Sequence, residues 1–186
     1  MSSAPYASAE VLGARLAELT PPPRDEGAIE LVVVRPSAGQ RETPARCRLT
    51  PDGGVEGDRW LQREHPLLAA QISVMRVDVA RALADGRPLD LFGDNLLVDL
   101  DLASDNLPIA TRVRVGTALC EVTAKPHTGC AKFAERFGPE ARELLSAERF
   151  RAWRLRGIYV RVIEAGAVGP GARVRVLSRP AVATEP

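Results

Sequence analysis

Short runs of hydrophobic and β-branched residues, separated by turns rich in Gly and Pro, recur along most of the chain. These runs predict strands at residues 28–36, 42–50, 71–75, 95–100, 111–116, 118–124, 157–166 and 172–177. Many short strands at close intervals are typical of a sheet that closes on itself. The pattern therefore predicts a mainly β (α+β) fold built on a barrel-like sheet.

A helical period appears in three other places. Residues 8–19 place leucines at helical spacing after Ser8, a candidate N-cap, and residues 75–86 show a second apolar helical face. The third helical region lies between residues 130 and 155, where Pro139 suits a first helical turn. We expect a few helices on the periphery of the barrel.

The length of 186 residues fits one domain with its own core. Hydrophobic residues make up 45% and charged residues 26%, which is ordinary for a folded chain. We expect an N-terminal helix and linker at residues 1–26, a single barrel domain at 27–178 and a mobile tail at 179–186.

The charges are balanced, with 25 basic residues against 24 acidic ones and a net charge of +1. A chain without an overall positive field has no electrostatic support for binding nucleic acid or an anionic membrane. No apolar stretch reaches the roughly 18 to 20 residues of a membrane span, and the first residues lack the pattern of a secretory leader. Three scattered cysteines are too few for a disulfide framework, so we expect free thiols and a cytoplasmic location.

Residues 125–138, "KPHTGCAKFAERFG", concentrate unusual residue types. They hold one of two histidines, one of three cysteines and both lysines of the chain: His127, Cys130, Lys125 and Lys132. A helix is predicted to begin directly after Cys130, and the positive end of a helix dipole favours the thiolate over the thiol. The two lysines and His127 add to this effect. Cys130 is therefore the predicted reactive or metal-binding cysteine, with His127 as a candidate catalytic partner.

The residues alone leave the chemistry of Cys130 open. A thiolate here fits a nucleophile, a carrier of sulfane sulfur or a soft metal ligand. His127 and Cys130 supply only two of the usually four ligands of structural zinc, and a histidine three residues from the cysteine often cannot turn back onto it. His127 is equally compatible with a turn residue. Cys47 and Cys120 alternate with polar residues in predicted strands and fit small core residues.

Four motifs follow one another in a recognisable order: "GDRW" (57–60), "GDNLLVDLDL" (93–102), "LPIATRVRVGTALCEVTAKPHTGC" (107–130) and "RGIYVRVIEAGAVGPGARVRV" (156–176). Their order and spacing resemble the MOSC family, named for the C-terminal domain of molybdenum cofactor sulfurase. The resemblance runs from Gly54 to Val176, and it is closest to the stand-alone bacterial proteins of the family.

The resemblance implies a compact MOSC-type β-barrel that binds the molybdenum cofactor, or handles sulfur destined for it, through Cys130. It also assigns cofactor-binding positions, which are Gly57, Asp58, Arg59, Asn95 and Arg156. The structural alternatives are a turn for Gly57 and Asp58, a strand cap for Asn95 and a solvated cation for Arg156.

The sequence departs from the family pattern in two places. Trp60 follows "GDR" where many relatives have a histidine, and the next histidine is His65. Three residues separate Pro126 from Cys130, whereas many relatives have proline directly before the cysteine. These departures leave Cys130 in place and leave the roles of His65 and His127 open.

The leading hypothesis is an oxidoreductase component that binds a molybdopterin-type cofactor, with Cys130 at the metal, and acts on N-hydroxylated substrates. Arg59, Lys125 and Lys132 would meet the cofactor's phosphate. The chain has no room for a pyridoxal phosphate domain or for flavin and iron–sulfur modules, so we expect a cofactor-supplying or electron-donating partner, or a cysteine desulfurase. The alternatives are a persulfide carrier (a sulfurtransferase) and a non-catalytic module that binds an anion or a protein.

Overall fold

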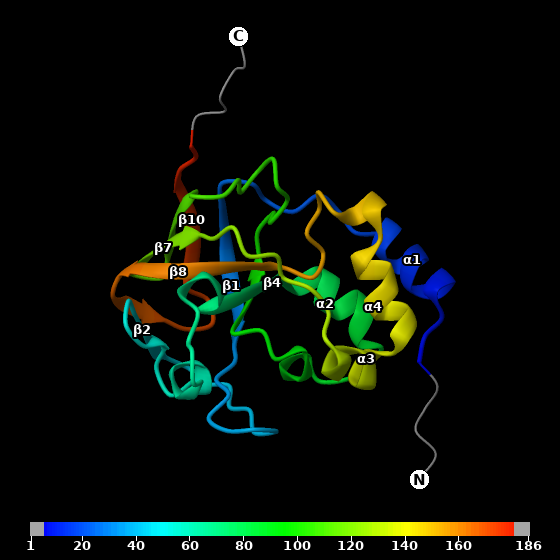
Figure 1. The fold of residues 1–186 in the computed structure, drawn as a ribbon. Coiled ribbons are helices and arrows are strands. Elements are labelled where there is room, and N and C mark those ends of the chain that lie inside the picture. Colours follow the sequence, from blue (N-terminus) through cyan, green and yellow to red (C-terminus); the bar gives the residue numbers. More distant parts are fainter. Residues whose placement is uncertain (1–5, 181–186) are drawn as a thin grey trace.

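The computed structural model describes residues 6–180, and its centre is a closed barrel (Figure 1). Seven strands follow one another around it in the order β1-β10-β6-β7-β8-β4-β5. Their bounds are β1 Glu26–Val32, β4 Ile72–Arg76, β5 Leu96–Asp99, β6 Arg112–Val115, β7 Ala118–Val122, β8 Ile158–Glu164 and β10 Arg173–Ser178. Neighbouring strands are antiparallel except for β4 and β5, which are parallel.

A small three-stranded sheet lies beside the barrel, in the order β3-β2-β9. Its strands are β2 Cys47–Thr50, β3 Gly54–Val55 and β9 Gly166–Val168. The sheet contributes Leu49, Val55 and Val168 to the same core as the barrel. It therefore covers part of the barrel and does not form a separate domain.

The helices gather on one side of the barrel (right in Figure 1). They are α1 Ala9–Ala17, α2 Val77–Ala84, α3 Ala131–Phe137 and α4 Pro139–Ser146, and four short 3₁₀ helices occupy Arg59–Gln62, Leu68–Ala70, Leu89–Phe92 and Glu148–Phe150 within the described residues. The Ser8 hydroxyl accepts a hydrogen bond from the amide of Val11 at 3.3 Å, and Pro139 opens α4. No helix in the described part of the chain has the length and apolar character that a membrane crossing requires.

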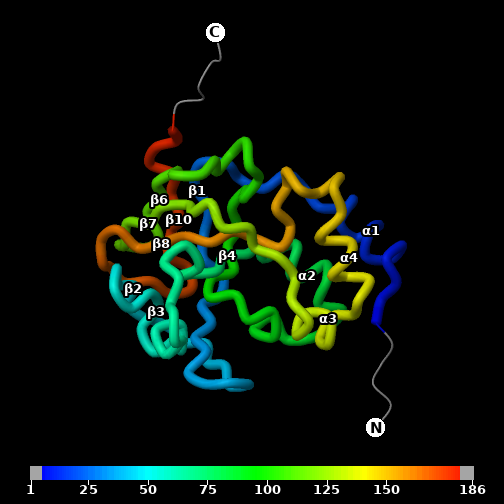
Figure 2. Tube along the Cα trace, in the orientation of Figure 1, coloured from blue at the N-terminus to red at the C-terminus, as the bar shows by residue number. Residues whose placement is uncertain are grey.

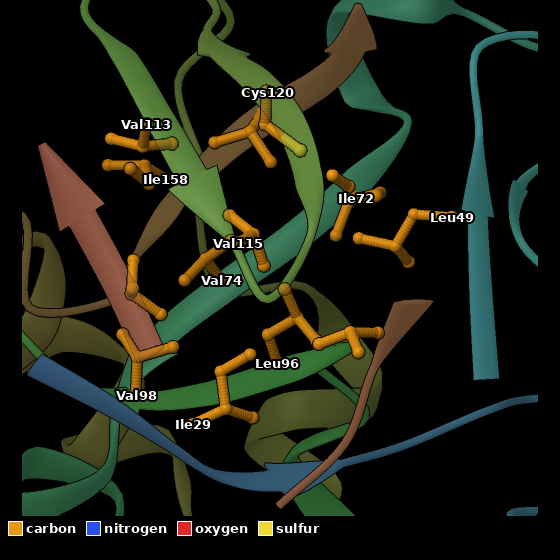
Figure 3. Close-up of a cluster of buried hydrophobic side chains, with 14 of the residues drawn as sticks. Ile29, Leu49, Ile72, Val74, Leu96, Val98, Val113, Val115, Cys120 and Ile158 are labelled. Atoms are coloured by element: carbon orange, nitrogen blue, oxygen red, sulfur yellow. The ribbon is translucent and has the colours of Figure 1, made fainter. Parts of the chain in front are cut away.

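Two hydrophobic cores meet across β4 and β5. Side chains alternate between the two faces of a strand, so Ile72 and Val74 point into the barrel while Met75 faces the helices. Figure 3 shows the barrel core, where residues of β4 and β5 converge with Cys120 of β7. The second core lies between these strands and the helices. Both faces of β4 are buried, and even the polar Gln71 and Ser73 of the run at 71–75 are withdrawn from solvent.

The structure confirms the predicted mainly β fold with peripheral helices and corrects its edges. The barrel begins one residue earlier than expected, because Glu26 already pairs with Arg175. Arg179, expected in a mobile tail, is held in place by hydrogen bonds to the Asn106 carbonyl at 2.7 Å and to Asp25 at 2.7 Å. The rest of the expected tail, at 181–186, lies outside the described residues, as does the start of the chain at 1–5.

Candidate functional site

The segment from residue 123 to residue 130 carries the predicted reactive cysteine from the barrel to the helices (Figure 2). The Thr123 amide donates a hydrogen bond to the Tyr159 carbonyl, and Cys130 is the N-cap of α3. Between them, residues 124–129 make no backbone hydrogen bond within the described chain. The Cys130 side chain is exposed. Residues 124–129 are therefore positioned by side-chain contacts, whereas the Cys130 carbonyl accepts hydrogen bonds from the amides of Phe133 and Ala134 in α3.

His127 provides the main contact of this segment with the protein interior. Its side chain is 5% exposed, its Nε2 lies 3.3 Å from Oδ1 of Asp94, and its ring lies 4.4 Å from the ring of Tyr159. Burial lowers the pKa of His127 to about 3, and the attraction of Asp94 only partly opposes this. His127 is thus neutral at physiological pH.

Gly157 makes room for this arrangement. Its φ is +103°, and a Cβ at this position would lie 2.1 Å from the Val74 carbonyl oxygen and 3.1 Å from Nδ1 of His127. Only glycine combines this backbone conformation with so close an approach. The "RG" pair at 156–157 therefore has a structural reason in the packing of His127.

Arg156 lies beside His127 and pairs with the same carboxylate. Its Nη1 donates a hydrogen bond of 2.6 Å to Oδ2 of Asp94, and its guanidinium lies over the Phe133 ring at 5.1 Å. The Arg156 side chain is 9% exposed and that of Asp94 is 1% exposed. Arg156 precedes β8 and is a buried, paired cation, so the alternative of a solvated helix face is wrong for this residue.

A cavity of about 220 Å³ opens in front of this group, and we call it the cationic cavity. Seven basic side chains line it: Arg35, Arg41, Arg59, Arg63, Lys132, Arg136 and Arg156. Asp94 is the one acidic residue in its lining. The lining also includes a histidine, a tyrosine and a thiol, which are His127, Tyr159 and Cys130. Burial lowers the pKa of Arg41, and the nearby charge of Arg136 adds to this effect. The crowding of like charges makes this cavity a place where an anion would relieve repulsion.

Arg35 is held in the cavity wall by residues that the sequence had assigned to the cofactor. Its Nε and Nη2 donate hydrogen bonds to the two carboxylate oxygens of Asp58 at 2.8 and 3.0 Å, and Nη2 also reaches Oδ1 of Asn95 at 3.0 Å. Burial alone would raise the pKa of Asp58, but the hydrogen bonds and charge of Arg35 outweigh it and hold that pKa below its usual range.

Asn95 extends this network into the barrel. Its Nδ2 donates hydrogen bonds to Asp58 and to the Val33 carbonyl, and its Oδ1 accepts one from the Ser73 hydroxyl at 3.1 Å. The Asn95 side chain is fully buried. Asp58 and Asn95 therefore orient Arg35 from behind and do not line the cationic cavity themselves.

The structure divides the predicted site residues into three groups. Those that line the cationic cavity are Arg59, His127, Cys130, Lys132 and Arg156. Those that support it from outside its lining are Gly57, Asp58 and Asn95, where Gly57 adopts a φ of +79° in the turn before Asp58. Lys125 points into a different, neighbouring cavity. His65 is 91% exposed and lies in neither cavity.

The sequence reasoning missed Arg35, Arg41, Arg63, Arg136 and Asp94. All but two of the 25 basic residues are arginine, so nothing in the sequence distinguished these four arginines from the others. Asp94 stood inside the quoted "GDN" motif and could have been found there as a carboxylate beside Asn95. Within the described residues, no three side chains among His, Cys, Asp and Glu converge to hold a metal ion by themselves.

A comparison with curated proteins finds a relative that matches part of the chain. YflK of Bacillus subtilis, described as an uncharacterized protein, is 36% identical over 95 residues, which are 50% of this chain and 40% of YflK. The match thus spans less than half of that protein. It carries no function over to this chain.

Solved structures share the fold more completely. The YuaD protein from Bacillus subtilis superposes with a TM-score of 0.62 at 20% identity, over 83% of this chain and 97% of its own. YiiM from Escherichia coli gives a TM-score of 0.56 at 22% identity, over 83% and 72% of the two chains, and YiiM from Geobacillus stearothermophilus gives 0.54 at 20%, over 86% and 76%. At these identities the likeness shows a common architecture.

The family assignment rests on the sequence itself. The model of the MOSC domain matches residues 56–175, which include the barrel strands β4 to β8, the start of β10 and most of the residues that line the cationic cavity. This stretch is more than half of the chain, and the barrel it forms is the one seen in the structural relatives. The chain therefore belongs to the MOSC domain family.

Proposed function

We propose that the protein binds the molybdenum cofactor in the cationic cavity, with Cys130 beside the metal. The observation that carries the proposal is the convergence of seven basic side chains and one exposed thiol on a single cavity. The cofactor of this family is a pterin that bears a phosphate, and clustered guanidinium groups bind phosphate well. A soft thiolate is a suitable ligand for a transition metal of this kind.

Unpartnered polar atoms support the fit. The donors Nε of Arg41 and Nε of Arg156 are buried and have no hydrogen-bond partner in the described structure. Buried polar groups are nearly always paired, so such atoms mark places where a ligand or water completes the network. Arg35, Arg59 and Lys132 add charge from other directions. The donor set thus matches an anion that has several acceptor atoms.

The chain's own residues then have separate tasks. The arginines neutralise the phosphate, Asp58 and Asn95 hold Arg35 in place, and Asp94 keeps Arg156 and neutral His127 oriented. When bound, the molybdenum would supply two-electron redox chemistry, such as the reduction of N-hydroxylated substrates. An electron-donating protein would have to supply the electrons for this reduction. On this proposal Cys130 holds the metal and His127 fixes the segment that carries the thiol.

A second function is favoured by the exposure of Cys130. An exposed thiol at a helix start can attack the persulfide of a cysteine desulfurase: the Cys130 thiolate forms a bond to the terminal sulfur, and the donor cysteine leaves as a thiolate. No oxidant is required, because the sulfane sulfur only changes its carrier.

The test compares metal, pterin and sulfur contents of variants made in a host that synthesises the cofactor. The wild type should hold molybdenum and pterin, Cys130→Ala should lose molybdenum, and Arg41→Gln should lose pterin, while the exposed Arg48→Gln serves as the charge control. Wild-type protein without either component would contradict cofactor binding. A single added sulfur on Cys130 after exposure to a desulfurase, seen by intact-mass spectrometry, would then support the carrier.

A further inference from the structure

A second cavity, of about 490 Å³, adjoins the cationic cavity and has no role in the proposed function. Three residues line both cavities: His127, Thr128 and Arg156. They form the wall between the two spaces. The volume lies within the range of about 300 to 1,000 Å³ that small-molecule sites occupy.

The lining of the second cavity is largely apolar. Five large hydrophobic side chains contribute to it: Ile109, Leu145, Phe150, Leu155 and Ile158. Ile109 is 51% exposed, and so is nearby Trp153 at 50%, whose ring lies 5.5 Å from that of Phe150. When an apolar ligand covers apolar surface at the mouth of such a cavity, that surface is removed from water, and this burial favours binding.

The charged residues of this lining are all basic: Lys125, Arg151, Arg154 and Arg156. Arg151 is paired with Glu148 at 2.8 Å, at the exposed rim. Arg154 donates a hydrogen bond of 2.7 Å to the Leu107 carbonyl, which leaves its positive charge without a carboxylate. Lys125 makes no ion pair with any residue of the described chain. The cavity therefore combines an apolar body with uncompensated positive charge.

The shared wall adds one unused donor. Nε of Arg156 is buried and unpartnered, and its side chain borders this cavity as well as the cationic one. A ligand with an oxygen acceptor would meet cations here, whereas an ammonium group would be repelled.

We propose that the second cavity binds a small amphipathic organic anion, with an aromatic or short aliphatic body and a carboxylate or a comparable oxyanion. The apolar side chains cover the body, and Lys125 with Arg154 faces the anionic end. This proposed site requires no cofactor, so it can be tested independently of molybdenum binding.

The test is a titration of cofactor-free protein by isothermal calorimetry with two probes of equal shape, 2-naphthoate and 2-naphthamide. The naphthoate should bind in a saturable way, about fivefold or more tightly than the neutral amide, and added salt should reduce this difference. No saturable binding at millimolar naphthoate, or equal affinity for both probes, would overturn the proposal.

Variants locate the bound probe. Ile109→Asp places a like charge in the apolar lining and should weaken naphthoate binding about tenfold or more. Leu68→Asp is the matched control, because Leu68 is also 51% exposed and lies in neither cavity. Lys125→Ala should weaken naphthoate and leave naphthamide unchanged. If Arg59→Gln, in the cationic cavity, removes binding while Ile109→Asp does not, the probe sits in the cationic cavity and the proposal is wrong.

Discussion

Nη1 of Arg156 lies 2.6 Å from Oδ2 of Asp94, and both side chains are withdrawn from solvent. The two residues are 62 positions apart, and they lie two residues before β8 and two residues before β5, respectively. Because Asp94 also lies against His127, this ion pair ties three segments of the chain together at the wall of the cationic cavity. The Asp94 carboxylate therefore contributes both to the packing of these segments and to the wall of the proposed binding cavity.

Removal of that carboxylate should be costly. Asp94→Asn leaves Arg156 buried without its counter-charge, and loss of one partner of a buried ion pair typically costs about 3 to 5 kcal/mol. Urea unfolding measures the change in the free energy of unfolding. Glu148→Gln is the matched control, since its pair with Arg151 is exposed and should contribute little. Equal effects of the two substitutions would show that the buried pair does not stabilise the fold.

His127 should make stability depend on pH. Its pKa is about 3 in the folded protein and about 6.5 in an unfolded chain, so the unfolded state binds one more proton between these values. The free energy of unfolding should fall as the pH drops through this window, by up to about 1.4 kcal/mol per pH unit.

The His127→Gln variant should show a shallower slope between about pH 5 and pH 6, measured by urea unfolding at several pH values. The control His65→Gln removes the other histidine, whose side chain is 91% exposed, and should keep the wild-type slope. An unchanged slope in His127→Gln would mean that burial does not lower the pKa of this histidine in the folded protein.

Gly157→Ala should destabilise the protein far more than a glycine substitution elsewhere. The new Cβ would lie 2.1 Å from the Val74 carbonyl oxygen, so the strand or the His127 segment must move. Gly171→Ala is the comparison, because its φ of +82° carries similar backbone strain but nothing lies within 4 Å of the added methyl group. Thermal unfolding should separate the two variants clearly, and coincident melting temperatures would argue against close packing at Gly157.

The three cysteines should differ sharply in their reaction with iodoacetamide. Cys130 is exposed and should be alkylated in the native protein. Burial raises the pKa of Cys120 to about 12 and that of Cys47 to about 11, so neither thiol ionises appreciably while the protein is folded. Mass spectrometry before and after urea treatment should find one and then three labelled sites. Native labelling of Cys120 would be inconsistent with its place in the barrel core.

Asp58 should affect anion binding without lining the cavity. Asp58→Asn removes the charge that holds Arg35, so the affinity for inorganic pyrophosphate should fall several-fold in calorimetric titrations. Asp52→Asn, at an exposed position in the preceding turn, makes the same chemical change as a control. Unchanged affinity in Asp58→Asn would show that Arg35 does not take part in binding.

Much of the barrel could be predicted because its strands carry their own signal. Ile72 and Val74 face one core and Met75 the other, and these three apolar residues within five positions were enough to place the strand at 71–75. Cys130 could be found because a cysteine, a histidine and both lysines cluster within a few residues.

The rest of the site depends on contacts between distant segments. Arg35, Arg41, Arg63 and Arg136 reach one cavity from different parts of the chain, and only the closed sheet brings them together. Asp58 and Asn95 were singled out as cofactor-binding residues, but the sequence could not show that their polar atoms face Arg35. Lys125 was grouped with Lys132 by proximity in the chain, and the structure sends the two side chains to different cavities.

The closure of the barrel has a consequence for how the chain is made. β1 is flanked by β5 and by β10, and its pairing with β10 joins Glu26 to Arg175 across 149 positions of sequence. During synthesis from the N-terminus, one edge of β1 stays unpaired until the last strand has emerged, and an unpaired edge can pair with other chains. Newly made chains therefore pass through an aggregation-prone stage that ends only when β10 is available.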